Sequence, residues 1–322
     1  MKTILKPWVK LKQTIDHEDY VMIQELQHYC TQEDQITLKL ELDYKLGLTS
    51  ENGNIKTVNE FMYFDGQQLI GYIGLGSWGA GTPIEANGMV SPEYRRQGVF
   101  KTLSELVIAE WKRRNSGNML LLTDRKSISG QAFIRETGAQ YKHSEYEMYL
   151  KQVDVEPLQR QLYGITLRKA TNDDACVIAQ QNRIYFNEEV LDCKNSLSDN
   201  EGESVFAEKE TTISISDMIL PEEEEKRGMK IYLAERDSQI IGKVHLQLLQ
   251  GIGGIYGLGV LPKHRGKGYG RAILIMAIEK LQEAKAREIM LQVAAENSKA
   301  LNLYTSCGFS EISTMDYYEI SV

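Results

Sequence analysis

The feature that most limits the fold of this chain is a pattern that occurs twice, 170 positions apart. At that separation the same residue types recur: Pro92 and Pro262, Arg95 and Arg265, Gly98 and Gly268, and Gly138 and Gly308. A repeat of this length indicates two structural units of related design. The 322 residues suit two domains of ordinary size. We therefore predict one domain over residues 1–155 and a second over 156–322, with the linker in residues 151–164.

The segments around each copy also match. A predicted hairpin precedes each one, with a turn at Asp65-Gly66 in the first and around Asp237-Ser238 in the second. Apolar residues at helical spacing follow each one, at 103–111 in the first and 273–284 in the second. The predicted order in each half is therefore hairpin, strand, glycine-containing turn and helix.

The turn of the second copy, residues 265–270, has the sequence Arg-Gly-Lys-Gly-Tyr-Gly and lies between a strand pattern and a helix pattern. The first N–H groups of a helix have no partners within it, and glycines let the chain approach an anion closely. This placement predicts a phosphate-bearing cofactor, although an ordinary strand-to-helix turn could carry the same residues. A Walker-type phosphate loop is excluded because the sequence contains no Gly-x-x-x-x-Gly-Lys-Ser/Thr motif. A dinucleotide-binding fold fits poorly, because it would place its glycines after the first strand of its domain, whereas this turn follows a predicted hairpin.

A second block follows the turn, after a strand pattern at 289–293. Its residues are Asn297, Ala300, Tyr304, Gly308 and Phe309. With Arg265, Gly268 and Gly270, this block makes the segment from about residue 231 to the end resemble a GNAT-family N-acetyltransferase, and the repeat makes the whole chain resemble a tandem member of that family.

The resemblance implies an α/β (α+β) fold with two GNAT-like domains. Each would have a mixed, mostly antiparallel central sheet, with a splayed V between the two central strands and helices on its faces. It also implies acetyl-CoA as the cofactor. The residues that match the cofactor-binding positions are Leu258, Val260, Arg265, Gly266, Lys267, Gly268, Tyr269, Gly270, Asn297 and Tyr304.

Two catalytic roles are expected in the second domain. By similarity to the family, a bulge near residues 258–260 would turn a free amide, that of Val260, toward the thioester oxygen; Gly257 and Gly259 favour such an irregularity. Tyr304 is expected to be the general acid, since a phenol is protonated at neutral pH and can protonate a departing thiolate. The alternative is that Tyr304 only packs against Phe309.

The other requirements are less well met. Asn297 is expected to contact the pantetheine, to cap the next helix, or both. No general base stands out: the strand before the turn holds no carboxylate, and Tyr256 is a weak candidate. A relayed water or a carboxylate from another element would have to serve. The missing base keeps open a second hypothesis, that of a non-catalytic acetyl-CoA sensor or interaction protein.

The first copy differs where the chemistry would take place. Phe100 replaces Gly270, and Ile134, which cannot donate a proton, replaces Tyr304. We therefore predict a degenerate first domain that serves as scaffold or as a wall of the substrate site. A second cofactor site there stays open, at Arg95, Arg96, Gln97, Gly98 and Val99.

Composition narrows the partners. A net charge of −8 argues against nucleic acid, and no apolar run approaches the length needed to span a bilayer. Four scattered cysteines, with no pair at metal-binding spacing, predict reduced thiols and no metal site; Cys307 is expected to be a buried thiol rather than a nucleophile. We expect a cytoplasmic protein that acts on a small-molecule or peptide amine. The acceptor's identity and the oligomeric state stay open.

Overall fold

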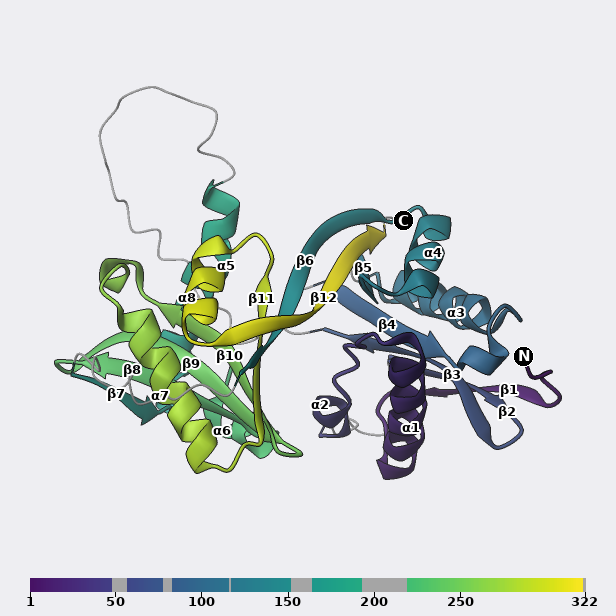
Figure 1. Cartoon of the computed structure of the whole chain (residues 1–322), viewed down its shortest axis with the longest axis horizontal. Helices are drawn as coiled ribbons and strands as arrows, with labels where there is room; N and C mark the ends of the chain where they lie inside the picture. The colour runs from purple at the N-terminus through teal and green to yellow at the C-terminus, as the bar shows by residue number, and fades with distance from the viewer. Residues whose placement is uncertain (48–56, 78–82, 116, 152–163, 193–218, 321–322) are drawn as a thin grey trace, which may run out of the picture. The chain divides into compact units, whose positions relative to one another are not determined.

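The computed structural model describes residues 1–47, 57–77, 83–115, 117–151, 164–192 and 219–320 (Figure 1). They form two compact units. The first unit comprises Met1–Met148, Val293–Ser298 and Glu311–Val322; the second comprises Tyr149–Gln292 and Lys299–Ser310. The predicted domain boundary after residue 155 falls outside the described residues and stays a prediction. Each unit is mixed α/β with a mostly antiparallel sheet, as the sequence predicts.

The first unit contains a sheet with the strand order β1-β2-β3-β4-β5-β12-β6. Its strands are β1 (Pro7–Lys12), β2 (Glu60–Asp65), β3 (Gln68–Gly76), β4 (Ile84–Val90), β5 (Met119–Asp124), β6 (Gln140–Leu150) and β12 (Phe309–Ile320). Its helices are α1 (His17–Asp34), α2 (Leu42–Leu46), α3 (Val99–Arg114) and α4 (Ile128–Thr137). The β4–β5 pairing is parallel, whereas β1–β2, β2–β3, β3–β4 and β5–β12 are antiparallel.

The second unit repeats this design in the order β7-β8-β9-β10-β11. Its strands are β7 (Ile165–Lys169), β8 (Met229–Arg236), β9 (Gln239–Leu249), β10 (Ile252–Val260) and β11 (Glu288–Ala294). Its helices are α5 (Ala175–Asp192), α6 (Pro221–Lys226), α7 (Tyr269–Glu283) and α8 (Ser298–Ser306). The β10–β11 pairing is parallel and the other three are antiparallel.

Both predicted hairpins are present. The β2–β3 turn places Gly66 at φ 60°, and the β8–β9 turn places Asp237 and Ser238 at φ 50° and 61°. Two consecutive residues with positive φ match the twist of the flanking strands, which is why short hairpin turns adopt this conformation. The turn residues thus set the register of β2 with β3 and of β8 with β9.

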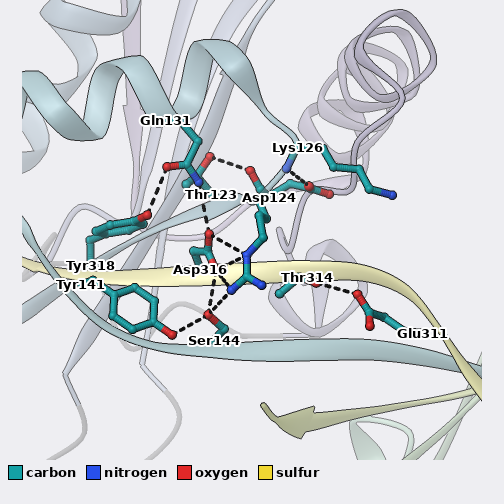
Figure 2. Close-up of polar contacts among 11 residues, drawn as sticks. Thr123, Asp124, Lys126, Gln131, Tyr141, Ser144, Glu311, Thr314, Asp316 and Tyr318 are labelled. Atoms are coloured by element: carbon teal, nitrogen blue, oxygen red, sulfur yellow. Dashed lines mark hydrogen bonds and ion pairs between the residues drawn. The ribbon is translucent and has the colours of Figure 1, made fainter. Parts of the chain in front are cut away.

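The last strand of the chain, β12, completes the sheet of the first unit. It runs antiparallel to β5, with Met315 opposite Asp124 and Ile320 opposite Met119. Figure 2 shows the polar contacts that hold it, centred on Asp316, which is only 4% exposed. Its carboxylate accepts hydrogen bonds from Ser144 Oγ at 2.7 Å and Gln131 Nε2 at 3.2 Å, and it pairs with Arg125 at 2.7 Å.

Helices cover both faces of the second unit's sheet. On one face, a Cβ built on Gly242 of β9 would lie 3.3 Å from Ile273 of α7, so α7 packs closely there. On the other face, Ile178 of α5 packs with Ile231 and Leu233 of β8. Because side chains alternate along a strand, the β9 residues next to Gly242 point toward α5. Among the described residues, no helix combines the length and apolar character needed to cross a membrane.

Candidate functional site

The central strand of the second unit, β10, contains the predicted bulge. Its antiparallel pairing with β9 shifts register between Tyr256 and Gly259, and Gly257 within this interval has φ 54°. A residue with a side chain rarely adopts that φ, so glycine makes the bulge possible. The side chain of Tyr185 from α5 packs directly against Gly259, where a Cβ would collide with the ring. The bulge is therefore enclosed on the α5 side.

Beyond the bulge, β10 no longer pairs with β11. The parallel pairing ends at Ile255 opposite Leu291, although β10 continues to Val260. The N–H of Leu261 donates to Ile241 O at 2.9 Å. Since neighbouring amides of an extended strand point to opposite edges, the N–H of Val260 points toward the β11 side. The predicted separation of the two central strands agrees with the structure; that the Val260 amide meets a thioester oxygen stays a prediction.

The glycine-containing turn leads from β10 into α7. After a 3₁₀ turn at Pro262–His264, Gly266 and Gly268 have φ 73° and 81°, and both are exposed. The Nε of Arg265 donates to Val260 O at 2.9 Å, and Lys267 Nζ donates to Lys263 O at 3.2 Å. The arginine therefore fixes the turn against the end of β10, which is a positional role in addition to its charge.

The remaining residues of the turn start α7. Tyr269 is buried. The centroid of its ring lies 6.4 Å from the centroid of the His264 ring and 5.2 Å from Cζ of Arg236. Only its main-chain N–H is therefore placed to meet a ligand at the helix N-terminus. A Cβ built on Gly270 would lie 3.5 Å from Leu303 of α8 and 3.7 Å from Val260. Gly270 is thus the point where α7, α8 and β10 come together.

Tyr304 lies on α8 and is 8% exposed. Burial raises the pKa of its hydroxyl to about 12, so the phenol is fully protonated at neutral pH. The ring also packs edge to face against Phe309, with centroids 6.2 Å apart. The packing alternative and the acid role are therefore compatible in geometry. Asn297 lies in the turn before α8, where its N–H donates to Ala294 O at 3.0 Å; its contact with pantetheine stays a prediction.

Cys307, the residue directly after α8, is buried, as expected. Burial is the largest influence on the pKa of its thiol and raises that pKa. A thiol that resists ionisation is a poor nucleophile. Cys193 lies outside the described residues.

Sequence reasoning missed a pair on β9 that consists of buried Lys243 and half-buried His245. Lys243 Nζ lies 3.0 Å from His245 Nε2 and 3.3 Å from the carbonyl oxygen of Gly257 in the bulge. Lys243 is 1% exposed, and burial lowers its pKa to about 7. Burial, and then the charge of Lys243, lower the pKa of His245 well below its ordinary range. A lysine inside an apolar strand pattern was the only signal in the sequence that could have found them.

The α5 side of this pair is also polar. The ring centroid of Tyr185 lies 5.6 Å from Lys243 Nζ, and the Tyr185 hydroxyl donates to Gln181 Oε1 at 2.7 Å. Gln181 is 2% exposed, and its Nε2 finds no hydrogen-bond partner among the described residues. A buried donor without a partner is uncommon and marks a position where a ligand atom or water could be received.

The first unit keeps the backbone of the turn. Arg96 and Gly98 have φ 62° and 85°, matching Gly266 and Gly268, and Arg95 Nε donates to Val90 O at 3.1 Å as Arg265 does to Val260. The guanidinium of Arg95 is also bound in a bidentate pair by the carboxylate of Asp34, at 2.9 and 2.6 Å.

The first unit also keeps the separation of its central strands, since the β4–β5 pairing ends at Ala86 although β4 continues to Val90. It differs from the second unit at other positions of the site. Strand β4 pairs with β3 from Gly71–Val90 to Gly76–Glu85 without a register shift, so it has no bulge. Phe100, at the position of Gly270, forms an edge-to-face pair with Phe133, with centroids 4.6 Å apart. Tyr72 matches Lys243 in the hairpin alignment, and its hydroxyl donates to Glu60 at 2.5 Å.

Comparison with known proteins supports the relationship that the motifs suggest. A model of the acetyltransferase (GNAT) family matches residues 193–309. The mycothiol acetyltransferase of Streptomyces avermitilis is 39% identical over 87 residues, which cover 26% of this chain and only 28% of that protein. The mycothiol acetyltransferase of Streptomyces coelicolor is 26% identical over 264 residues, covering 78% of this chain and 76% of that protein.

Two solved structures share the fold over the whole chain. A GCN5-related N-acetyltransferase from Sphaerobacter thermophilus has a TM-score of 0.69 at 16% identity, covering 98% of this chain and 95% of that one. A tandem GNAT protein from the clavulanic acid biosynthesis pathway has a TM-score of 0.67 at 14% identity and covers 98% of each chain. The family model thus matches the second half of the chain, and the chain as a whole shares its fold with solved GNAT structures, one of them a tandem GNAT protein.

Proposed function

We propose that the second unit transfers an acetyl group from acetyl-CoA to a primary amine by direct attack. The observation that carries the proposal is the end of β10. Its pairing with β11 stops at Ile255, and the N–H of Val260 points to the β11 side directly before the turn into α7. A backbone donor aimed at a carbonyl oxygen and a helix N-terminus suited to phosphate lie on consecutive stretches of chain.

The residues present fit acetyl-CoA. The main-chain N–H groups from Gly266 to Gly270 would hold the pyrophosphate, since the glycines of this turn are exposed and α7 begins at Tyr269. The edge of β10 beyond Ile255 would hold the pantetheine amides as a neighbouring strand would. Leu258 lies in this stretch, and Asn297 would lie at the pantetheine from the β11–α8 turn.

When bound, acetyl-CoA supplies the thioester that the amine attacks. Val260 N–H would donate a hydrogen bond to the carbonyl oxygen as negative charge develops there; loss of one such donor costs about 3 kcal/mol in other acyl-transfer sites. The hydroxyl of Tyr304 would give its proton to the departing sulfur. Its pKa of about 12 keeps the phenol protonated at neutral pH, so that the proton is present when the thiolate departs.

The first unit is proposed to be a scaffold rather than a second catalytic centre. Its β4 has no bulge, and the Phe100–Phe133 pair occupies the place where Gly270 and Leu303 meet in the second unit. The retained turn at residues 95–99 would then be a structural remnant. The first unit gives no support to the hypothesis of a non-catalytic acetyl-CoA sensor. For the second unit, that hypothesis requires that acetyl-CoA binds without being turned over.

Thiol release from acetyl-CoA tests the proposal. The acceptor panel should include small amines, peptides with a free N-terminus or lysine, aminoglycosides and thiol-bearing amino sugars. We expect turnover on at least one class, with acetyl-CoA binding measured separately by calorimetry. Binding without turnover on any acceptor would favour the sensor, and absence of binding would overturn both hypotheses.

A further inference from the structure

The hydrogen-bond partners of Lys243 show which part of its amino group is available for a proton. A neutral lysine nitrogen has two N–H groups and one lone pair. Its two nearest polar partners are His245 Nε2 at 3.0 Å and Gly257 O at 3.3 Å, and both can accept. If both N–H groups are used in this way, the lone pair of Nζ remains available for a proton. In this arrangement two hydrogen bonds hold Nζ in place, and its lone pair can act as a base.

The surroundings favour the neutral form of the lysine. The strand β8 presents Leu233 and Ile231 opposite Lys243 and His245. Strand β10 presents Tyr256 opposite His245, and the described part of α5 presents Tyr185 and Gln181. In the described parts of β8, β10 and α5, the titratable groups that these pairings and contacts place facing the pair are the two tyrosines. No carboxylate among the described residues shifts the pKa of either member, and burial is the largest cause for both.

The pair also lies next to the part of β10 where the thioester is proposed to bind. Gly257, whose carbonyl binds Lys243, is three residues from Val260, and Gly259 is the register partner of Lys243. Lys243 points to the α5 face of the sheet, where the unpartnered Nε2 of Gln181 is buried beside Tyr185. Because Tyr185 covers this face and leaves Lys243 only 1% exposed, an acceptor amine would have to displace the Tyr185 ring to meet Lys243 beside the end of β10.

We propose that Lys243 is the general base that takes a proton from the acceptor amine, and that His245 is the residue that positions it. This inference rests on the proposed function and supplies the base that the sequence did not reveal. The acceptor nitrogen forms a bond to the acyl carbon, and the carbon–sulfur bond breaks. One amine proton passes to Lys243 Nζ, and the sulfur takes the proton of Tyr304. Lys243 then releases its proton to solvent, and the Tyr304 phenolate regains one.

Only the second unit carries this base. At the matching positions the first unit has Tyr72 and Gly74. Tyr72 donates to Glu60, and Lys45 Nζ lies 3.1 Å from both Glu60 and the Tyr72 hydroxyl. Burial and the neighbouring Glu60 raise the pKa of Tyr72 well above its ordinary value. The three side chains of this cluster bind one another, unlike Lys243, whose partners are a histidine and a backbone carbonyl.

The test compares Lys243→Met with Lys230→Met, which changes an exposed lysine on the neighbouring strand. Methionine fills a similar volume without a charge, so the fold should be retained. The wild type should lose kcat/KM as the pH falls through about 7. Lys243→Met should lose about 100-fold in kcat/KM at pH 8 with acetyl-CoA affinity unchanged, and the remaining activity should follow the acceptor's own pKa. Lys230→Met should match the wild type.

Two results would overturn the inference, and they are distinguishable. If the wild type turns over an amine and Lys243→Met retains its rate and pH profile, Lys243 is not the base, while the acetyltransferase proposal stands. If the wild type turns over no amine, the proposed function fails and this inference fails with it. Should Lys243→Met not fold, His245→Gln serves instead. It keeps an acceptor for Lys243 but no titrating ring, so it should retain the pH 7 limb; a profile that loses the limb would assign it to His245 and overturn the role of Lys243.

Discussion

Gly270 and Leu303 meet where α7 begins against α8: a Cβ on Gly270 would lie 3.5 Å from Leu303 Cδ2. At the same place in the first unit, Phe100 and Phe133 form an edge-to-face ring pair with centroids 4.6 Å apart. The two units therefore share a backbone but differ in what fills the junction beside the glycine turn. The size of residue 270 should decide whether the turn can receive a diphosphate.

Gly270→Phe should weaken acetyl-CoA binding by at least about tenfold, a loss of about 1.4 kcal/mol. The added ring would extend toward Leu303 and Val260 and occupy the start of α7. Gly270→Ala is the matched control, because its Cβ would make only ordinary van der Waals contact. Calorimetric titration of both variants checks the expectation. Equal affinities for the two variants would show that the junction does not border the cofactor.

Tyr304→Phe should lower kcat by about 100-fold and leave the KM for acetyl-CoA nearly unchanged. The hydroxyl is proposed to act only when sulfur departs, so its loss should not affect ground-state binding. Tyr29→Phe, an exposed tyrosine of α1, is the control. Steady-state kinetics on the best acceptor separates the two parameters. A rise in KM at constant kcat would mean that Tyr304 is a binding residue.

The half-buried His245 should make the protein less stable in acid. Its folded-state pKa lies well below the unfolded value of about 6.5. The unfolded chain therefore binds the extra proton first, and the stability present above pH 6.5 is lost as the pH falls below it. His245→Leu should remove this part of the decline between pH 6.5 and 5, whereas His17→Gln, at an exposed site, should not. Melting curves across that range compare them; parallel curves for all three proteins would contradict the depressed pKa.

Asp316 should contribute substantially to the stability of the first unit. It is buried and binds Arg125, Ser144 and Gln131 (Figure 2). Asp316→Ala should lower the free energy of unfolding by about 2 kcal/mol, because it leaves these partners unsatisfied while half-exposed Arg125 can turn to water. Glu311→Ala, at an exposed position of the same strand, should change it by less than about 0.5 kcal/mol. Urea denaturation measures both; similar losses would show that the network adds little.

The sequence predicted the parts of the fold that local chemistry determines. The hairpin turns follow from Asp65-Gly66 and Asp237-Ser238. The bulge was expected from the resemblance to the GNAT family, and Gly257, which has positive φ, permits it. The helices after each glycine turn follow from apolar periodicity. These features depend on residues close together in the chain, so a single sequence can reveal them.

Features that depend on distant pairing could not be predicted in this way. Nothing in residues 309–320 indicates that they pair with β5, almost two hundred positions earlier. The proposed base on β9 was missed for the same reason: the sequence shows only a lysine in an apolar strand pattern, and its burial depends on packing against α5 and the bulge at Gly257. Burial, not residue type, gives this lysine its lowered pKa.

The amide NMR spectrum during titration with acetyl-CoA tests the central claim most directly, since that claim is that the turn after β10 and the end of that strand hold the ligand through main-chain donors. We predict that the N–H resonances of Val260 and of Gly266 through Gly270 shift at saturation, while those of residues 95–99 in the first unit stay in place. Unchanged resonances from 260 to 270 at saturating ligand would contradict the account.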